Sequence, residues 1–408
     1  MKKVFVHYDG WGEHWLLGTL AENGRDLLFE YSAEAIKNGL ELSAPHLKLR
    51  TQAYGGFPDY LQRLPGLIAD ALPDGWGLLV MDRLFRGNGV NPAALSPLDR
   101  LTFIGTRAMG ALTFEPADAL TLSNQDVKLL ELARGARTVI EGKDSDTLRQ
   151  LALMGGCPHG ARPKVLVHYN VKTGTMGTAP IDGGQPWMVK FQARDKHKEV
   201  CALEEVYAHL ARDCGLDMPD TRSFDLDRTL AGFGIARFDV DQGLRVPVHT
   251  LAGALHADFR VPSMDYNIFL RATRAFTRDE REVRKAYERA AFNVLFNNRD
   301  DHGKNFSFRL GRDRRWRLAP CYDLTFCEGR GGEHQMDVCG EGRNITRAHM
   351  LALAKQGGLD TRWATGAIDR MVEHAGRFKA HTASRGIRPA TVKHVAAAIE
   401  ANRARLAA

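Results

Sequence analysis

The side chains best suited to chemistry lie between residues 298 and 323. Residues 298–305 read NRDDHGKN, so that Asp300 precedes Asn305 by five positions, and Asp323 follows further along the chain. Phosphoryl transfer from ATP needs such a set, because one carboxylate accepts the proton of the attacking hydroxyl while an asparagine and a second carboxylate hold Mg²⁺ against the phosphates. Protein kinases use the same Asp–Asn spacing. The pattern therefore indicates a phosphoryl-transfer site.

The alternative for the same residues is a polar turn, since Asp and Asn commonly hydrogen-bond their own backbone in turns. Two short strand-like runs, 306–310 and 316–318, separate Asn305 from Asp323 as a hairpin would. Kinase catalytic loops are followed by a hairpin and a metal-binding aspartate in this order, so the hairpin favours the phosphoryl-transfer interpretation.

A nucleotide also needs backbone amides and a cation around its phosphates. Residues 155–164 could form a glycine-containing turn, although neither GxGxxG nor GxxxxGK[ST] is present. Lys190 ends an apolar strand-like run, and Glu204 on the next expected helix could pair with it as kinases pair a strand lysine with a helix glutamate. The alternative for Lys190 is an edge lysine that reaches water.

The elements expected in the first half of the chain begin with strands. Residues 3–8 alternate apolar and polar side chains, and 14–20 and 27–31 are similar runs between glycine turns. From about residue 58 the apolar spacing becomes helical, and residues 110–116 return to strand before a proline.

The second half is expected to be mainly helical. Residues 200–213 and 281–296 have helical patterns, the second running directly into the polar segment 297–305. Residues 345–408 alternate helical runs with glycine and proline breaks.

Composition bounds the class of protein. A chain of 408 residues predicts two or three domains at roughly 150 residues each. No apolar run is long enough for a membrane span or a signal peptide, and no CxxC or zinc-ligand pattern is present, so six free thiols in a reducing cytoplasm are expected. The net charge of +7 is spread along the chain, which is typical of a basic soluble surface. The hydrolase motif GxSxG and the metal motif HExxH are absent.

Several short motifs in order resemble the HipA-like serine/threonine kinases, the toxins of bacterial toxin–antitoxin pairs. Residues 72–77 (LPDGWG) and 110–116 (GALTFEP) resemble the family's N-terminal elements. Residues 160–164 (GARPK) are similar to its phosphate loop, and 236–239 (ARFD) to its hinge. The segment 298–305 with LAPCYD at 318–323 resembles its catalytic and metal-binding loops.

The resemblance implies a role for each matching position. Asp300 would be the catalytic base, and Asn305 and Asp323 would bind Mg²⁺. Asp301 is the alternative candidate for the catalytic base, but it precedes Asn305 by only four positions, whereas the kinase spacing is five. Contacts to ATP would come from the phosphate loop, a strand lysine, the hinge and the catalytic loop, namely His159, Gly160, Ala161, Arg162, Pro163, Lys164, Lys190, Ala236, Arg237, Phe238, Asp239, His302 and Asn305.

Two positions depart from the family pattern. The family often has a serine at the position of Cys157, and its autophosphorylation ejects the phosphate loop. A thiol is not a phosphoacceptor for this chemistry, so Cys157 is not expected to be phosphorylated. His159 replaces the second glycine of the usual pair.

The sequence thus predicts an α+β protein with a β-rich N-terminal subdomain and a two-lobed, protein-kinase-like core whose C-terminal lobe is largely helical. The expected divisions are 1–118 (HipA-like N-terminal subdomain), 119–150 (connector), 151–240 (small ATP-binding lobe) and 241–408 (helical lobe).

The predicted activity is an ATP- and Mg²⁺-dependent serine/threonine protein kinase acting as a cytoplasmic toxin. Its substrate would be a protein, for which the family precedent is an aminoacyl-tRNA synthetase. A helix-turn-helix antitoxin and, through it, operator DNA are the expected partners, with no membrane association. Two alternatives are a weakly catalytic nucleotide-binding regulator within an antitoxin–DNA complex and a small-molecule phosphotransferase.

Overall fold

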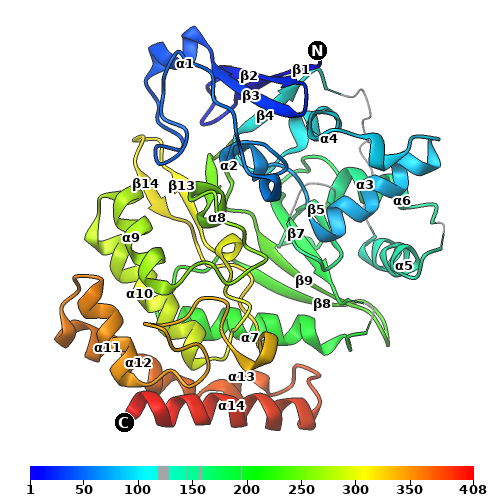
Figure 1. The fold of residues 1–408 in the computed structure, drawn as a ribbon. Coiled ribbons are helices and arrows are strands. Elements are labelled where there is room, and N and C mark those ends of the chain that lie inside the picture. Colours follow the sequence, from blue (N-terminus) through cyan, green and yellow to red (C-terminus); the bar gives the residue numbers. More distant parts are fainter. Residues whose placement is uncertain (118–127, 144, 156–158, 194) are drawn as a thin grey trace. The chain divides into compact units, whose positions relative to one another are not determined.

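The computed structural model describes residues 1–117, 128–143, 145–155, 159–193 and 195–408. They form two compact units (Figure 1). Unit 1 comprises Met1–Cys201, Arg222–His249 and Gly253–His256, and unit 2 comprises Ala202–Thr221, Thr250–Ala252 and Ala257–Ala408.

A four-stranded antiparallel sheet begins unit 1. Its order is β3-β2-β1-β4, with β1 at Lys3–Tyr8, β2 at Trp15–Asn23, β3 at Asp26–Tyr31 and β4 at Leu112–Glu115. Val4, Val6 and Tyr8 are buried while their neighbours are more exposed, so the alternation in the sequence becomes one core-facing side of β1. The strands predicted in this region are confirmed.

Short helices follow this part of the chain. Their bounds are α1 Ala33–Asn38, α2 Gly66–Ala69, α3 Gly75–Gly87 and α4 Pro97–Ile104. Ser96 caps α4 by accepting from Asp99 N–H, while the Asp99 carboxylate accepts from Ser96 N–H at 2.9 Å. This capping box explains why α4 begins at Pro97.

A second sheet in unit 1 carries the predicted nucleotide-binding elements. Its order is β6-β5-β7-β9-β8, with β5 Lys164–Tyr169, β6 Met176–Gly177, β7 Gln185–Phe191, β8 Thr221–Asp225 and β9 Ala231–Ala236. A small hairpin of β10 (Val240–Asp241) and β11 (Leu244–Arg245) follows. The pairs β5–β7 and β7–β9 are antiparallel.

Helices α5 (Leu129–Ile140) and α6 (Leu148–Gly155) share a hydrophobic core with this sheet. On α5 the buried positions recur at intervals of three and four residues, which is the period of one helical face. That face packs in the cluster containing Trp76, Val165 and Val189. Helix α5 falls in the range predicted as a connector, α6 runs from its end into the range predicted as the small lobe, and the four-part division of the chain stays a prediction.

Unit 2 is mainly helical. Helix α7 spans Glu199–Asp213 and α8 spans Leu251–Ala254. The remaining helices are α9 Tyr266–Thr277, α10 Glu280–Leu295, α11 Arg347–Gln356, α12 Thr361–Ala375, α13 Phe378–Thr382 and α14 Pro389–Ala407. The strands are β12 Val248–Thr250, β13 Ser307–Leu310 and β14 Trp316–Leu318.

Helix α10 is the central element of unit 2 and leads into the predicted catalytic loop. It packs against α9, α12 and α14 (Figure 1). Asp279 caps its N-terminus by accepting from Arg281 N–H at 2.9 Å, and from Ala286 to Leu295 most of its residues are buried. The predicted helices near 200–213 and 281–296, and the hairpin of β13 and β14, are confirmed.

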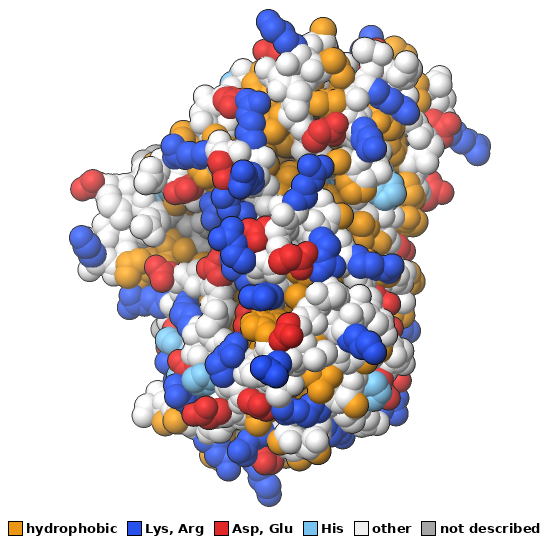
Figure 2. Space-filling model, turned by 90° about the vertical axis from the view of Figure 1, so that its left-hand side faces the viewer, with side chains coloured by type: hydrophobic (Ala, Val, Ile, Leu, Met, Phe, Trp, Pro, Cys, Tyr) orange, Lys and Arg blue, Asp and Glu red, His pale blue; other side chains and the backbone are white. Residues whose placement is uncertain are grey.

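Three expectations from composition can be compared with the described residues. None of the helices among them is long and apolar enough to cross a membrane. Five of the six cysteines are free thiols, and Cys157 lies outside the described residues. Basic and acidic side chains are interspersed over the face shown in Figure 2, in agreement with the scattered charges of the sequence.

Candidate active site

The predicted catalytic loop is held firmly where it leaves α10. Asn297 donates from Nδ2 to Cys327 O at 3.1 Å, and Asn298 donates from Nδ2 to Asn293 Oδ1 at 2.9 Å. His302 then caps a 3₁₀ turn at Gly303–Asn305, accepting from Lys304 N–H at 3.3 Å. These bonds fix both ends of the segment that carries the two adjacent aspartates.

The two aspartates of the loop have opposite environments. Asp301 has no exposed surface, and its carboxylate accepts from Tyr266 OH at 2.6 Å, His334 Nδ1 at 2.7 Å and Gln335 N–H at 2.8 Å. The Asp300 side chain is 57% exposed, with Oδ1 3.8 Å from His302 Nε2. Because Asp301 is enclosed and hydrogen-bonded at both oxygens, Asp300 is the one that a hydroxyl group from solvent could approach.

A tyrosine links the segments that carry Asn305 and Asp323. Tyr322 OH donates to Lys304 O at 2.7 Å and lies 2.5 Å from Ser307 Oγ, which ties the residue before Asp323 to the residue before Asn305. Asn305 donates from Nδ2 to Asp300 O at 2.7 Å, so its amide oxygen remains as the acceptor end.

This pair of donors suits Mg²⁺. Asp323 has φ +57°, a conformation in which aspartate is enriched among non-glycine residues. An amide oxygen and a carboxylate are the hard oxygen ligands that Mg²⁺ takes, usually together with waters and substrate phosphates. The described residues contain no group of three or more His, Cys, Asp or Glu side chains that could hold a metal by themselves. Asn305 and Asp323 therefore fit a magnesium ion that is shared with a nucleotide.

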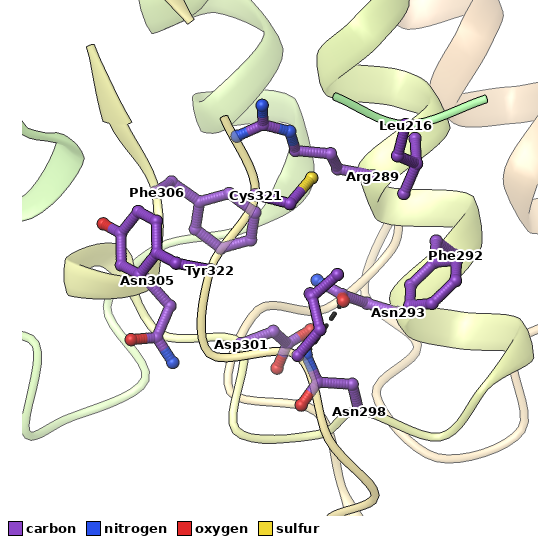
Figure 3. A pocket seen from close by; sticks show the side chains of 11 residues that line it. Leu216, Arg289, Phe292, Asn293, Asn298, Asp301, Asn305, Phe306, Cys321 and Tyr322 are labelled. Carbon is purple, nitrogen blue, oxygen red and sulfur yellow. Dashed lines mark hydrogen bonds between the residues drawn. The ribbon is translucent and has the colours of Figure 1, made fainter. Parts of the chain in front are cut away.

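A small pocket lies behind this loop, and Figure 3 shows Asn298, Asp301, Asn305 and Tyr322 among the side chains that line it. Its volume is about 10 Å³, which is about the space of one water molecule. Asn298 Oδ1 and Arg289 Nη1 are buried there without a partner among the described residues. The pocket is too small for a nucleotide.

Two buried lysines face each other in the second sheet of unit 1. Lys164 on β5 is paired in register with Lys190 on β7, and Lys190 is in turn opposite Phe233 on β9. Lys190 Nζ lies 5.9 Å from the centre of the Phe233 ring. Cross-strand partners project to the same face, and like charges directly opposite each other are unfavourable unless an anion compensates them. The contact of Lys190 with ATP phosphates stays a prediction.

The predicted phosphate loop precedes β5 directly. Gly160 has φ +102°, Ala161 is exposed, and Arg162 donates from Nε to Phe191 O at 3.2 Å. Pro163 O accepts from Phe191 N–H at 2.8 Å, and Lys164 Nζ donates to His159 O. The loop is thus fixed to the sheet at its second half, while the position of Cys157 lies outside the described residues.

The predicted hinge follows β9, and its aspartate is hydrogen-bonded within the protein. Arg237 N–H donates to Pro186 O at 2.9 Å, and its guanidinium contacts both oxygens of Asp239, at 2.9 and 2.7 Å. The buried Asp239 also accepts from Gly110 N–H at 2.9 Å. Burial alone would raise the pKa of the Asp239 carboxyl. The positive charge of Arg237 and these hydrogen bonds outweigh burial and hold the pKa below its usual value.

The roles predicted for Ala236, Phe238 and Asp239 at adenine and ribose stay predictions. A ribose hydroxyl would have to share the Asp239 oxygens with Arg237 and Gly110. Glu204 on α7 is buried, and its pairing with Lys190 also stays a prediction.

Two family models match most of the chain. The HipA-like C-terminal domain matches residues 157–377, and the HipA N-terminal domain matches residues 9–115. The chain belongs to the HipA family. No curated protein sequence matches this HipA-family chain.

A solved structure agrees with the fold. A chain of the Shewanella oneidensis MR-1 toxin–antitoxin complex of HipA, HipB and operator DNA is 20% identical, with a TM-score of 0.73 over 99% of this chain and 97% of that chain. The Helicobacter pylori proinflammatory kinase CtkA is 12% identical over 60% of this chain and 89% of its own, with a TM-score of 0.42, too low to indicate a shared fold. The predicted α+β fold with a β-rich N-terminal region is confirmed.

One cluster in this HipA-family chain was not predicted. Ser43 Oγ lies 3.0 Å from His249 Nε2, and His249 Nδ1 lies 2.7 Å from Asp70 Oδ2. This is the order of groups in a serine hydrolase, yet Ser43 and His249 have no exposed surface. Because no substrate can reach the hydroxyl, the cluster is a buried polar network that holds three distant segments of unit 1 together.

Proposed function

We propose that this HipA-family protein is an ATP- and Mg²⁺-dependent serine/threonine protein kinase that acts as the toxin of a toxin–antitoxin pair in the cytoplasm. The main observation behind the proposal is that the two adjacent aspartates of the predicted catalytic loop differ in burial and in hydrogen bonding. Asp301 is buried in a saturated network, whereas the exposed Asp300 is hydrogen-bonded through its carbonyl to Asn305. That arrangement supports one proton acceptor beside one metal ligand.

Each group has a defined task in this mechanism. Asp300 accepts the proton of the substrate hydroxyl as the hydroxyl oxygen bonds to the terminal phosphorus of ATP, while the bond from that phosphorus to the bridging oxygen breaks and ADP leaves. Asn305 and Asp323 would hold Mg²⁺, which would neutralise charge on the phosphates. Lys190 and the loop ending at Lys164 offset the remaining negative charge. The transfer needs no covalent intermediate on the protein, so positioning and electrostatics supply the catalysis.

The proposed partners follow from the comparison. The Shewanella HipA was solved with HipB and operator DNA. We expect this chain to bind a small helix-turn-helix antitoxin and to approach DNA through it. The net charge of +7 favours proximity to DNA but supplies no base reading. The purified chain should therefore bind DNA weakly and without sequence preference, and tight operator binding by the chain alone would contradict this.

Labelled ATP incubated with the purified protein and a bacterial lysate tests the activity. We expect Mg²⁺-dependent label on one or a few proteins, and phosphoamino-acid analysis should find phosphoserine or phosphothreonine. Label only on small molecules would support a phosphotransferase instead. Tight Mg-ATP binding with no transfer would favour the regulatory alternative, in which the protein acts within an antitoxin–DNA complex.

A further inference from the structure

The motif at residues 72–77 lies directly against the predicted phosphate loop, and both belong to unit 1. Gly160 N–H donates to Asp74 Oδ1, and Trp76 N–H donates back to Gly160 O at 3.1 Å. Both polar groups of Gly160 are therefore bonded to residues of one short segment, 86 residues earlier in the chain. A glycine held at both its N–H and its C=O has little freedom to rotate.

Two further bonds extend this attachment to both sides of Gly160. Trp76 Nε1 donates to Lys164 O at 3.1 Å, at the start of β5. The His159 ring lies with Nε2 2.9 Å from Leu72 O. The segment 72–76 thus contacts the loop before, at and after Gly160.

Gly75 allows this approach. A Cβ at this position would lie 2.8 Å from both Ala161 Cα and Gly160 O, and its φ of +43° is also one that side chains rarely adopt. Backbone therefore packs on backbone here, and no larger residue fits without moving the loop.

Asp74 is placed for the loop rather than for its own helix. It is the N-cap of α3, where aspartate commonly accepts from the second or third helical N–H, yet it makes no such bond. Its carboxylate instead accepts from Gly160 N–H. Trp76 is buried in the core of unit 1 with Val80, Leu132 and Val165, so the segment has a rigid support.

One backbone N–H of the loop, that of Ala161, is placed where it could donate to a ligand. Gly160 N–H is used by Asp74, whereas the exposed Ala161 has no hydrogen bond from its N–H within the described residues. Phosphate-binding loops present backbone amides of this kind to the anion. Holding Gly160 therefore sets the direction of the next peptide.

We propose that residues 72–77 form a clamp that positions the phosphate-binding loop, with Asp74 and Trp76 as positioning residues for ATP. The inference rests on the proposed kinase function. It assigns a task to the N-terminal domain, namely control of nucleotide affinity through the backbone of Gly160. A partner that displaced the start of α3 would weaken ATP binding without touching the nucleotide.

The test compares Mg-ATP binding by calorimetry and steady-state kinetics in the full chain. Asp74→Ala should weaken Mg-ATP binding and raise KM for ATP about tenfold with kcat within about twofold, since one charge-assisted hydrogen bond to the loop is lost. Asp74→Asn retains an acceptor oxygen and should fall between wild type and alanine. Asp82→Ala on the same helix breaks a 2.7 Å ion pair with Arg100 and should leave ATP binding unchanged.

Hydrogen exchange supplies a readout that needs no nucleotide. Among residues 160–164, of which Pro163 has no amide hydrogen, Gly160 loses the acceptor of its N–H and should exchange faster in Asp74→Ala than in wild type or Asp82→Ala. If wild type binds no Mg-ATP, the kinase proposal fails, and the exchange result alone then decides the clamp. Unchanged exchange of residues 160–164 in Asp74→Ala would overturn the clamp, as would unchanged affinity in a protein that binds Mg-ATP.

Discussion

Replacing Asp301 with asparagine should destabilise unit 2 rather than remove a proton acceptor. The carboxylate is fully buried and accepts three hydrogen bonds, from Tyr266, His334 and Gln335. Asparagine offers one acceptor oxygen and would turn its NH₂ group toward a donor. Breaking a buried charged network by changing one partner costs about 3–5 kcal/mol. With the NH₂ group at the Oδ2 position, the bonds from Tyr266 and His334 are lost, and at roughly 1.5–3 kcal/mol each the two amount to about 3–6 kcal/mol, which overlaps that range.

Urea unfolding followed by circular dichroism measures this loss. Asp301→Asn should reduce the free energy of unfolding by about 3–5 kcal/mol, while the exposed Asp300→Asn should change it by less than about 0.5 kcal/mol. Combining Asp301→Asn with Tyr266→Phe should cost less than the sum of the two single changes, because both break the same 2.6 Å bond. If Asp301→Asn were as stable as wild type but unable to transfer phosphate, Asp301 would be the base and its structural role would be excluded.

Three further predictions concern the ligands and the pH dependence. Asp323→Ala should weaken Mg²⁺-dependent ATP binding, measured by calorimetry beside a melting curve; unchanged affinity would make Asp323 structural. Lys190→Ala should weaken ATP binding while the exposed Lys172→Ala does not. Burial lowers the pKa of His256 to about 4, with help from neighbouring histidines. The stability from neutral His256 is therefore full above about pH 6.5 and is lost progressively as the pH falls toward 4, because the unfolded state takes up the proton first. His256→Gln, which can still accept from Gly66 N–H, should flatten this slope in unfolding measurements, and an unchanged slope would exclude His256 as its source.

The secondary structure around the site was predictable because local patterns determine it. Alternation located β1, and helical spacing located α10 to within a residue or two. Short strand-like runs located the hairpin of β13 and β14 for the same reason. These signals depend on neighbours a few positions apart in the chain.

The differing environments of the two aspartates were not predictable in this way. Spacing ranks Asp300 above Asp301, but burial decides between them, and it depends on Tyr266 and on residues 334 and 335. The contact of Asp74 with Gly160 likewise joins positions 86 residues apart. A single sequence has no periodicity that reports such a pair, although the motif at 72–77 marked the segment.

The hydrogen bonds of Asp239 were likewise not predictable from the sequence. The hinge motif predicts a residue near the ribose, while the structure places its carboxylate between Arg237 and Gly110. Both partners are polar groups common at turns, so neither stands out in the sequence. The Ser43 network, whose members are up to 206 residues apart, could be found only from the fold.

The rate of phosphoryl transfer by Asp300→Asn at saturating Mg-ATP tests the central claim most directly. The variant should fold and bind Mg-ATP as wild type does, while transfer falls by about 10²–10⁴-fold, the usual contribution of a general base. Asp313→Asn, at an exposed carboxylate between β13 and β14, is the matched control and should transfer at the wild-type rate. Near-wild-type transfer by Asp300→Asn would show that Asp300 is not the general base.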